Sequence, residues 1–152
     1  YIKAKDNSPR HLVDGGVFAN NPAMCAYVEA IKLWKGVQPA DEFILSLGTG
    51  KIERPYTYEN TGKYGYLQWL FPILDVLMSS VAEVVDFQVR QIFELAQVPQ
   101  NYIRMEPQLI GCSIRMDNAS PRNIKALESV AQRYIDHNGN QIEEVIKKLK
   151  VK

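Results

Sequence analysis

The sequence predicts an α/β fold in which helices cover both faces of a sheet. Short apolar stretches alternate with longer amphipathic ones along most of the chain, and this order favours α/β over all-α or all-β architectures. A length of 152 residues and a hydrophobic content of 46% are sufficient for one ordinary core. No linker or internal repeat divides the sequence, so we expect residues 1–152 to belong to a single domain.

Local start and stop signals mark the elements. Asn21 is a suitable N-cap before Pro22 at the first helical position, and Ser120-Pro121 marks another helix start in the same way. Val98-Pro99 ends a long apolar helix. In chain order we expect a strand at residues 11–13, a helix from 22 to about 35, a strand at 42–47, a surface loop at 51–63, a helix at 73–95, a strand at 102–106, a helix from 121 to about 137 and a last helix after 140.

The long helix is expected to bury one stripe of side chains, because apolar residues recur along it at three- and four-residue spacing. The stripe consists of Leu74, Leu77, Val81, Val84 or Val85, Gln88, Ile92 and Leu95. An aromatic cluster precedes it and contains Tyr64, Tyr66, Trp69 and Phe71. Such a cluster ordinarily packs into the core. Alternatively, it contacts acyl chains or makes a transient contact with a membrane surface.

Three short strands are few for a sheet that must cover this many helices. The sequence also begins at Tyr1, without an initiator methionine or a signal-like segment. We therefore expect this chain to be a segment of a longer polypeptide, with the other strands of its sheet preceding Tyr1.

Composition excludes several classes of function. The net charge of +1 gives no indication of nucleic-acid binding. Cys25 and Cys112 form neither a metal-binding spacing nor a disulfide framework, and we expect both to be buried free thiols. The apolar stretch at residues 64–85 is not a membrane span, because Asp75 would lie near its centre. The sequence does not identify the cellular compartment of the protein, although the cytoplasm is favoured.

Asp14 is the candidate catalytic residue. It follows the apolar pair Leu12-Val13 and is followed at once by Gly15-Gly16. Glycines permit a sharp turn and a close approach of other groups, so this arrangement is suited to exposing a reactive carboxylate in a pocket. The alternative is an ordinary aspartate in a strand-to-helix turn, satisfied by backbone N–H groups.

A second motif favours the functional interpretation. Residues 44–47 form another apolar strand, which ends at Gly48-Thr49-Gly50 after one intervening helix. The ends of two such strands lie along one edge of an open α/β sheet, where clefts form. A nucleotide-binding loop is not indicated here, because Glu53 replaces the third glycine and Pro55 follows where a helix should begin.

These motifs together resemble the C-terminal half of the catalytic domain of patatin-like phospholipases. The resemblance is carried by Leu12-Val13-Asp14-Gly15-Gly16-Val17, Ala19-Asn20-Asn21-Pro22, Ser46-Leu47-Gly48-Thr49-Gly50, Asn101-Tyr102-Ile103-Arg104 and Met116-Asp117-Asn118-Ala119. It implies a three-layer α/β/α core and a lipid acyl hydrolase with a Ser–Asp dyad. Asp14 matches the aspartate of that dyad, and Gly15, Gly16, Asn20 and Asn21 match its supporting motif.

The sequence departs from the family pattern in one respect: it contains no G-x-S-x-G, the motif that carries the family's nucleophile. The serine is therefore expected in the N-terminal half of the domain, upstream of this chain. The implied substrate is a glycerolipid or lysophospholipid ester, and no metal or other cofactor is implied. The alternative is a catalytically inactive module of the same fold that binds lipid or a protein partner.

Neither histidine is expected to complete a triad. His11 and Val13 lie on one face of the expected strand, whereas Asp14 points to the other. His137 lies near the end of a distant helix, where a surface or C-terminal capping role is expected.

Overall fold

The computed structural model of the chain describes residues 2–3, 9–10, 12–52, 56–113, 115 and 117–150. The strands are β1 (Ile2–Lys3), β2 (Pro9–Arg10), β3 (Ile44–Leu47) and β4 (Tyr102–Met105). The α-helices are α1 (Gly16–Ala19), α2 (Ala23–Leu33), α3 (Tyr58–Thr61), α4 (Tyr66–Leu95), α5 (Pro121–His137) and α6 (Gly139–Lys150). Two short 3₁₀ helices, Pro39–Asp41 and Pro99–Asn101, precede β3 and β4.

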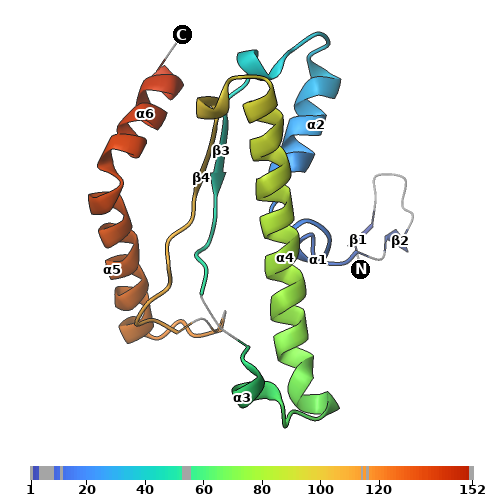
Figure 1. Cartoon of the computed structure of the whole chain (residues 1–152), viewed down its shortest axis with the longest axis vertical. Coiled ribbons are helices and arrows are strands. Elements are labelled where there is room, and N and C mark those ends of the chain that lie inside the picture. Colours follow the sequence, from blue (N-terminus) through green and yellow to red (C-terminus); the bar gives the residue numbers. More distant parts are fainter. Residues whose placement is uncertain are drawn as a thin grey trace.

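The central feature is a parallel pair of strands joined by one long crossover helix. Ile44 lies opposite Tyr102 and Leu47 opposite Met105, and α4 connects the two strands (Figure 1). The pairing continues past the strand ends, where the Gly48 N–H donates to the Met105 carbonyl. The prediction of an α/β fold is therefore confirmed, with a parallel sheet of two strands among the residues that the structure describes.

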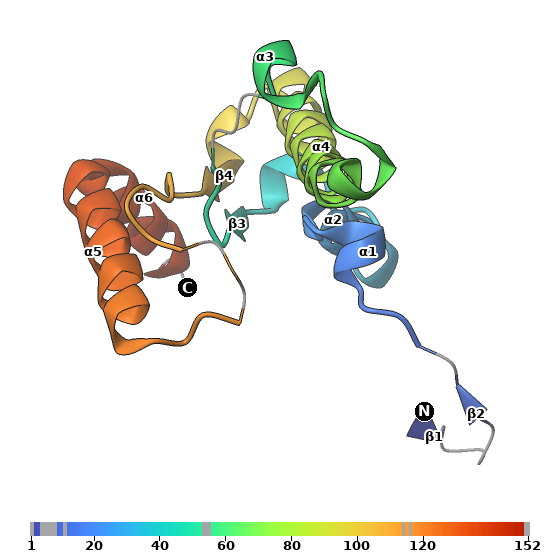
Figure 2. The ribbon, with the colours of Figure 1, turned by 90° about the horizontal axis from the view of Figure 1, so that it is seen from below.

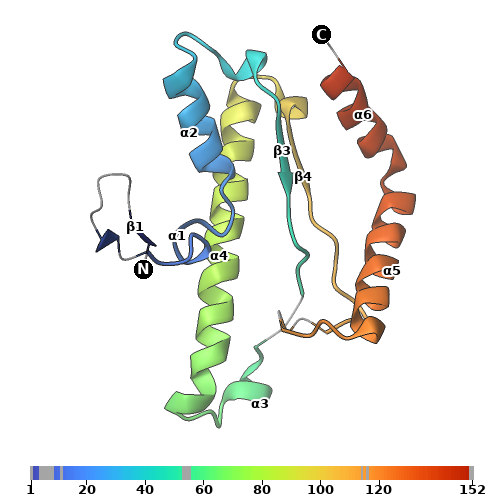
Figure 3. The ribbon, with the colours of Figure 1, turned by 180° about the vertical axis from the view of Figure 1, so that it is seen from behind.

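Helices lie on both sides of the strand pair. Helices α1, α2 and α4 lie on one side of β3 and β4, and α5 and α6 lie on the other (Figure 2). The view from behind shows the same order, with the strands between α4 and the α5–α6 pair (Figure 3). This layering is consistent with part of a three-layer domain.

The best-buried apolar cluster lies where α2 and α4 meet the strands. It contains Ala23, Val89, Phe93 and Tyr102. The Phe93 ring stacks on Tyr102, with ring centroids 6.2 Å apart, and meets Tyr27 edge to face at 5.8 Å. This cluster fixes α2, and thus the segment just before it, against β3 and β4.

The structure has no strand at residues 12–14, contrary to the sequence-based expectation. Leu12 and Val13 are exposed, and no described strand runs beside them. A strand needs a partner for its backbone groups, so the local apolar pattern alone does not produce one here. His11 lies outside the described residues, so its exclusion from a catalytic triad stays a prediction.

The long helix α4 differs from its expected form in two ways. It begins at Tyr66 and contains Pro72 inside it, so the proline does not set its start. The predicted stripe is buried only in part. Val85 and Ile92 pack against the core. Leu74, Leu77, Val81, Val84 and Leu95 are exposed, whereas Val89 and Phe93 on a neighbouring face are fully buried. Helix α4 is apolar on more than one face, which is typical of a helix buried on several sides.

Other expectations have mixed outcomes. The Ser120 side chain caps α5 by accepting from the Asn123 N–H at 3.3 Å, as predicted. The expected loop at 51–63 contains the short helix α3.

Cys25 is exposed, so the prediction of a buried thiol is wrong for this residue. Tyr66 is fully exposed, which contradicts core packing for this member of the aromatic cluster.

None of the helices in the described part of the chain is both long and apolar enough to span a bilayer.

Candidate active site

Asp14 begins the turn that leads into α1. Its side-chain oxygen Oδ1 accepts a hydrogen bond from the Gly16 N–H at 2.6 Å, and its carbonyl accepts from the Val17 N–H at 3.1 Å. These bonds fix the orientation of the carboxylate relative to the helix start. The side chain is exposed in this chain rather than buried in a pocket, and Asp14 does not line the cavity described below.

The two glycines after Asp14 are not equivalent. A Cβ atom on Gly16 would lie 3.0 Å from Asp14 Oδ1, so a side chain there would press on the carboxylate. Gly15 has φ −61°, which any residue adopts, and a Cβ there would meet nothing within 4 Å. The close approach expected from Gly15-Gly16 is therefore required at Gly16 only.

Asn21 anchors the Asp14 segment to the core. It is 2% exposed, and its Oδ1 accepts from the Ala23 N–H at 3.2 Å. Its side-chain amide donates to the Ala82 carbonyl of α4 at 3.2 Å, and the Ser46 hydroxyl of β3 donates to Oδ1 at 3.4 Å. Asn20, in contrast, is exposed. One side chain thus ties the chain that follows Asp14 to α2, α4 and β3.

Polar contacts continue from Asn21 to the ends of the strands. Arg104 of β4 donates to the Ser46 hydroxyl at 2.8 Å and pairs with Glu106 at 2.9 Å. Both members of this ion pair are largely shielded from solvent, which strengthens their mutual attraction. The Asp14 segment is therefore connected through Asn21 and Ser46 to the carboxyl end of β4.

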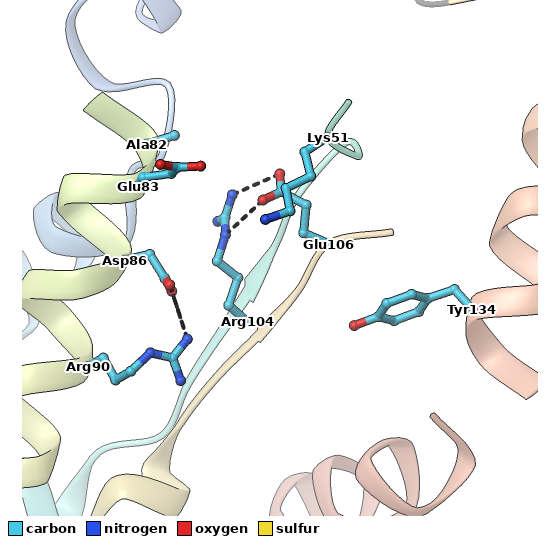
Figure 4. A pocket seen from close by; sticks show the side chains of 8 residues that line it. All are labelled: Lys51, Ala82, Glu83, Asp86, Arg90, Arg104, Glu106 and Tyr134. Atoms are coloured by element: carbon cyan, nitrogen blue, oxygen red, sulfur yellow. Dashed lines mark hydrogen bonds and ion pairs between the residues drawn. The ribbon is translucent and has the colours of Figure 1, made fainter. Parts of the chain in front are cut away.

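A cavity of about 200 Å³ opens beside this network (Figure 4). Ala82, Glu83, Asp86 and Arg90 of α4 line one side of it, and Tyr134 of α5 points toward it from the other. The Tyr102 hydroxyl donates to Asp86 Oδ1 at 2.6 Å. Burial, together with that hydrogen bond, raises the pKa of Tyr102 to about 12. The hydroxyl therefore stays protonated and acts as a donor.

The loop after β3 is held in a conformation that requires glycine. Gly50 has φ +101°, and a Cβ there would also collide with the Leu109 side chain. Lys51 then bridges to the strand-like segment after β4, donating to the Pro107 carbonyl at 3.0 Å. Gly48-Thr49-Gly50 is thus a close-packed loop at the carboxyl edge of the strands.

Comparison with known proteins gives the family. No family model matches the chain. Patatin-like protein 2 of rice (Oryza sativa subsp. indica) is 28% identical over 94% of the chain, and patatin-like protein 2 of Arabidopsis thaliana is 33% identical over 77%. Patatin-2-Kuras 4 of Solanum tuberosum is 30% identical over 87%. The chain belongs to the patatin-like family.

This patatin-like chain corresponds to only part of its relatives. It spans 41% of the length of the rice protein and 33% of the Arabidopsis protein. The match to the rice protein covers 94% of the 152 residues, which leaves about nine outside it, so the matched region includes Asp14. The recognised motif is therefore part of the region of homology.

Other polar residues of the patatin-like chain have local partners. Ser79 and Ser80 donate to backbone carbonyls of α4, and Ser129 donates to a carbonyl of α5. His137 is the last residue of α5, and its Nδ1 is hydrogen-bonded to the Arg133 carbonyl at 2.6 Å. The predicted capping role of His137 is thereby confirmed.

The sequence analysis missed the network around Arg104 and Glu106. A signal was present: Tyr102 and Arg104 alternate on one face of their strand, and Ser46 lies opposite Arg104 in the parallel register. That register depends on tertiary pairing, which the local pattern did not reveal. Glu42 was also missed, although both its carboxylate oxygens are buried without a partner among the described residues.

Asn21→Ala is expected to lower the free energy of unfolding by about 2 kcal/mol, because it removes the side-chain link to the Ala82 carbonyl of α4 and leaves the buried Ala23 N–H without its acceptor. Urea denaturation followed by circular dichroism measures this loss. The exposed neighbour provides a matched control: Asn20→Ala should change stability by less than about 0.5 kcal/mol. Equal losses of unfolding free energy in the two variants would show that the buried contacts of Asn21 add no more stability than an exposed asparagine does.

Proposed function

We propose that this chain is part of a lipid acyl hydrolase with a Ser–Asp dyad, in which Asp14 is the catalytic base. The nucleophilic serine belongs to the N-terminal half of the same domain, outside this chain. The observation that carries the proposal is homology to patatin-like proteins over nearly the whole chain, in a region that includes Asp14. The hydrolase function is proposed on the basis of this family relationship.

The contacts of Asp14 suit the proposed role. Oδ1 accepts from the Gly16 N–H, so Oδ2 is the oxygen that takes the proton of the serine hydroxyl. The serine oxygen attacks the ester carbonyl, the C–O bond to the leaving alcohol breaks, and an acyl-enzyme forms. The proton passes from Asp14 to that alcohol. Water then attacks the acyl-enzyme in the same manner and restores the serine.

The proposed substrate is a glycerolipid or lysophospholipid ester. Large apolar side chains flank Asp14, and Val17 and Phe18 of α1 are both exposed. Together with the rest of the domain, they would form an apolar wall beside the carboxylate, suited to an acyl chain. Exposed Tyr66 and Leu67 at the start of α4 provide a surface for transient membrane contact.

A fluorophosphonate probe tests the proposal in the complete protein, because it reacts covalently only with an activated serine. We expect stoichiometric labelling of a serine upstream of Tyr1 and parallel loss of ester hydrolysis, measured by mass spectrometry and a fluorogenic ester. A complete protein that is folded, binds lipid vesicles and takes up no probe would instead be the inactive module of this fold.

A further inference from the structure

The Arg104 guanidinium is held by the Glu106 carboxylate, two residues further along the chain. Its Nε donates to Glu106 Oε2 at 3.3 Å and its Nη2 lies 2.9 Å from Oε1, so two of its nitrogens bind one carboxylate (Figure 4). The Arg104 side chain is only 11% exposed. Pairing at two points fixes the plane of the guanidinium, and with it the direction in which the third nitrogen points.

The end of β3 leaves room for this carboxylate. A Cβ atom on Gly48 would lie 2.7 Å from Glu106 Cδ, closer than a Cβ atom approaches another carbon in proteins. Because Glu106 is held by Arg104, its side chain cannot move aside without loss of the ion pair. The absence of a side chain at position 48 is therefore a condition for the Arg104–Glu106 pair.

The third guanidinium nitrogen sets the direction of a chain of hydrogen bonds. Nη1 of Arg104 donates to the Ser46 hydroxyl at 2.8 Å, and Ser46 is 8% exposed. Since arginine can only donate, the hydroxyl accepts this bond and its one proton is directed at Asn21 Oδ1, 3.4 Å away. A charged donor also polarises the hydroxyl and strengthens the bond that the hydroxyl makes in turn. The chain of bonds therefore runs in one direction, from Arg104 to Asn21.

Asn21 transmits this restraint to the turn that holds Asp14. Only residues 15–20 separate the two side chains in sequence, and four of them form α1. The Gly16 N–H binds Asp14 Oδ1, and the Val17 N–H binds the Asp14 carbonyl. The carboxylate is thus fixed to α1, and α1 leads directly to Asn21. A displacement of Asn21 therefore displaces the carboxylate.

We propose that Arg104 is a positioning residue for Asp14, acting through Ser46 and Asn21, with Glu106 holding the guanidinium in place. The inference rests on the proposed function, because it assigns to these side chains the placing of the carboxylate against the serine. Arg104 acts on turnover through geometry and not through contact with the substrate. A displacement of a reacting group by about 1 Å costs about 10²-fold in rate, so the effect is large enough to measure.

The first test is kinetic and uses the complete protein. Ser46→Ala removes one oxygen and breaks the chain of bonds while the Arg104–Glu106 pair stays in place, so it tests the inference even where Arg104→Met fails to fold. Arg104→Met removes the donors and keeps the length of the side chain. We expect each variant to lower kcat for a monomeric ester by about 10- to 100-fold with KM within about twofold, because the base moves and substrate binding does not change.

Combined variants show whether Arg104 acts through Ser46 and on Asp14. The double variant of Arg104→Met and Ser46→Ala should have the kcat of the single variants within about twofold, because both changes break one chain of bonds. In an Asp14→Asn background, Ser46→Ala should change the residual rate by less than about twofold, since no base is left to position. Losses of kcat that multiply in either combination would overturn the inference.

Two other arginines are matched controls. Arg90 lines the same cavity and pairs with an aspartate of α4 rather than with Ser46. Arg115 pairs with an acid two residues further along the chain, as Arg104 does, but both members of its pair are exposed. Arg90→Met and Arg115→Met should each leave kcat within about twofold. A loss with Arg90→Met as large as that with Arg104→Met would assign the effect to the charge of the cavity and overturn the inference.

Amide hydrogen exchange gives a readout that needs no activity. In the complete protein, Ser46→Ala and Arg104→Met should speed exchange in the peptide at residues 15–21 by about tenfold, measured by mass spectrometry, and leave the peptide of α5 unchanged. This pattern without fluorophosphonate labelling would reject the hydrolase and keep the positioning role. Labelling with unchanged exchange at residues 15–21 would overturn the inference and keep the hydrolase. Faster exchange in both peptides would also overturn it, since Arg104 would then only stabilise the fold.

Discussion

Asp14→Asn in the complete protein is expected to lower ester hydrolysis by about 10³-fold or more, with little change in stability. Asparagine keeps an oxygen that can accept from the Gly16 N–H, so the turn into α1 is preserved. It loses the ability to take the proton of the serine hydroxyl. The kcat for a monomeric ester and the thermal midpoint of the same preparations measure the two effects.

A matched control separates this role from a general effect of charge. Asp136 is also exposed, and its partner is the Gln132 side chain on the same helix. Asp136→Asn should leave kcat within about twofold, because it lies on α5 away from the proposed dyad. Turnover by Asp14→Asn at a level similar to that of Asp136→Asn would remove Asp14 from the mechanism.

Elements with strong local signals were predictable from sequence. Helix α5 begins where Ser120-Pro121 predicts it, because its cap is made by adjacent residues. Strand β4 begins at Tyr102, as its alternating pattern predicts. The strand expected before Asp14 is absent because its stability depends on a neighbouring strand rather than on Leu12 and Val13 themselves.

The orientation of α4 could not be predicted for a different reason. Leu77 and Val81 form a regular stripe, but so do Val89 and Phe93 on a neighbouring face. The periodicity of apolar residues does not show which of two apolar faces of a helix is buried. The core of this chain uses the face of Val89, and the face of Leu77 stays exposed. An apolar helix with one uncovered face is consistent with a larger domain that contributes the missing surface.

The candidate site was predictable as a motif but not as a geometry. Asp14, Gly16 and Asn21 were identified from their order in the chain. The predicted N-cap is one residue too early, because Pro22 is the N-cap of α2, but Asn21 still accepts from the Ala23 N–H. Its contacts with Ala82 and Ser46 join residues 61 and 25 positions away in the sequence. Such contacts follow from packing, so a single sequence gives no local signal for them.

Phe93→Ala is expected to lower the free energy of unfolding by about 3–5 kcal/mol. Phe93 has 0% exposure and lies between the rings of Tyr27 and Tyr102. Removing it leaves a cavity where α2, α4 and β4 meet, and also removes two aromatic contacts. Denaturant unfolding of the 152-residue chain measures the loss. Phe93→Leu provides a milder variant that retains the fold, with an expected loss of about 1 kcal/mol.

Phe87 is the matched control on the same helix, because it is 63% exposed. Phe87→Ala should cost less than about 1 kcal/mol in this chain, since it opens no cavity. In the complete protein its cost should rise if the rest of the domain covers that face of α4. If Phe93→Ala and Phe87→Ala lowered the free energy of unfolding of the isolated chain equally, the cluster around Phe93 would not be the core of this chain. The packing of α2 and α4 against β4 would then lose its main support.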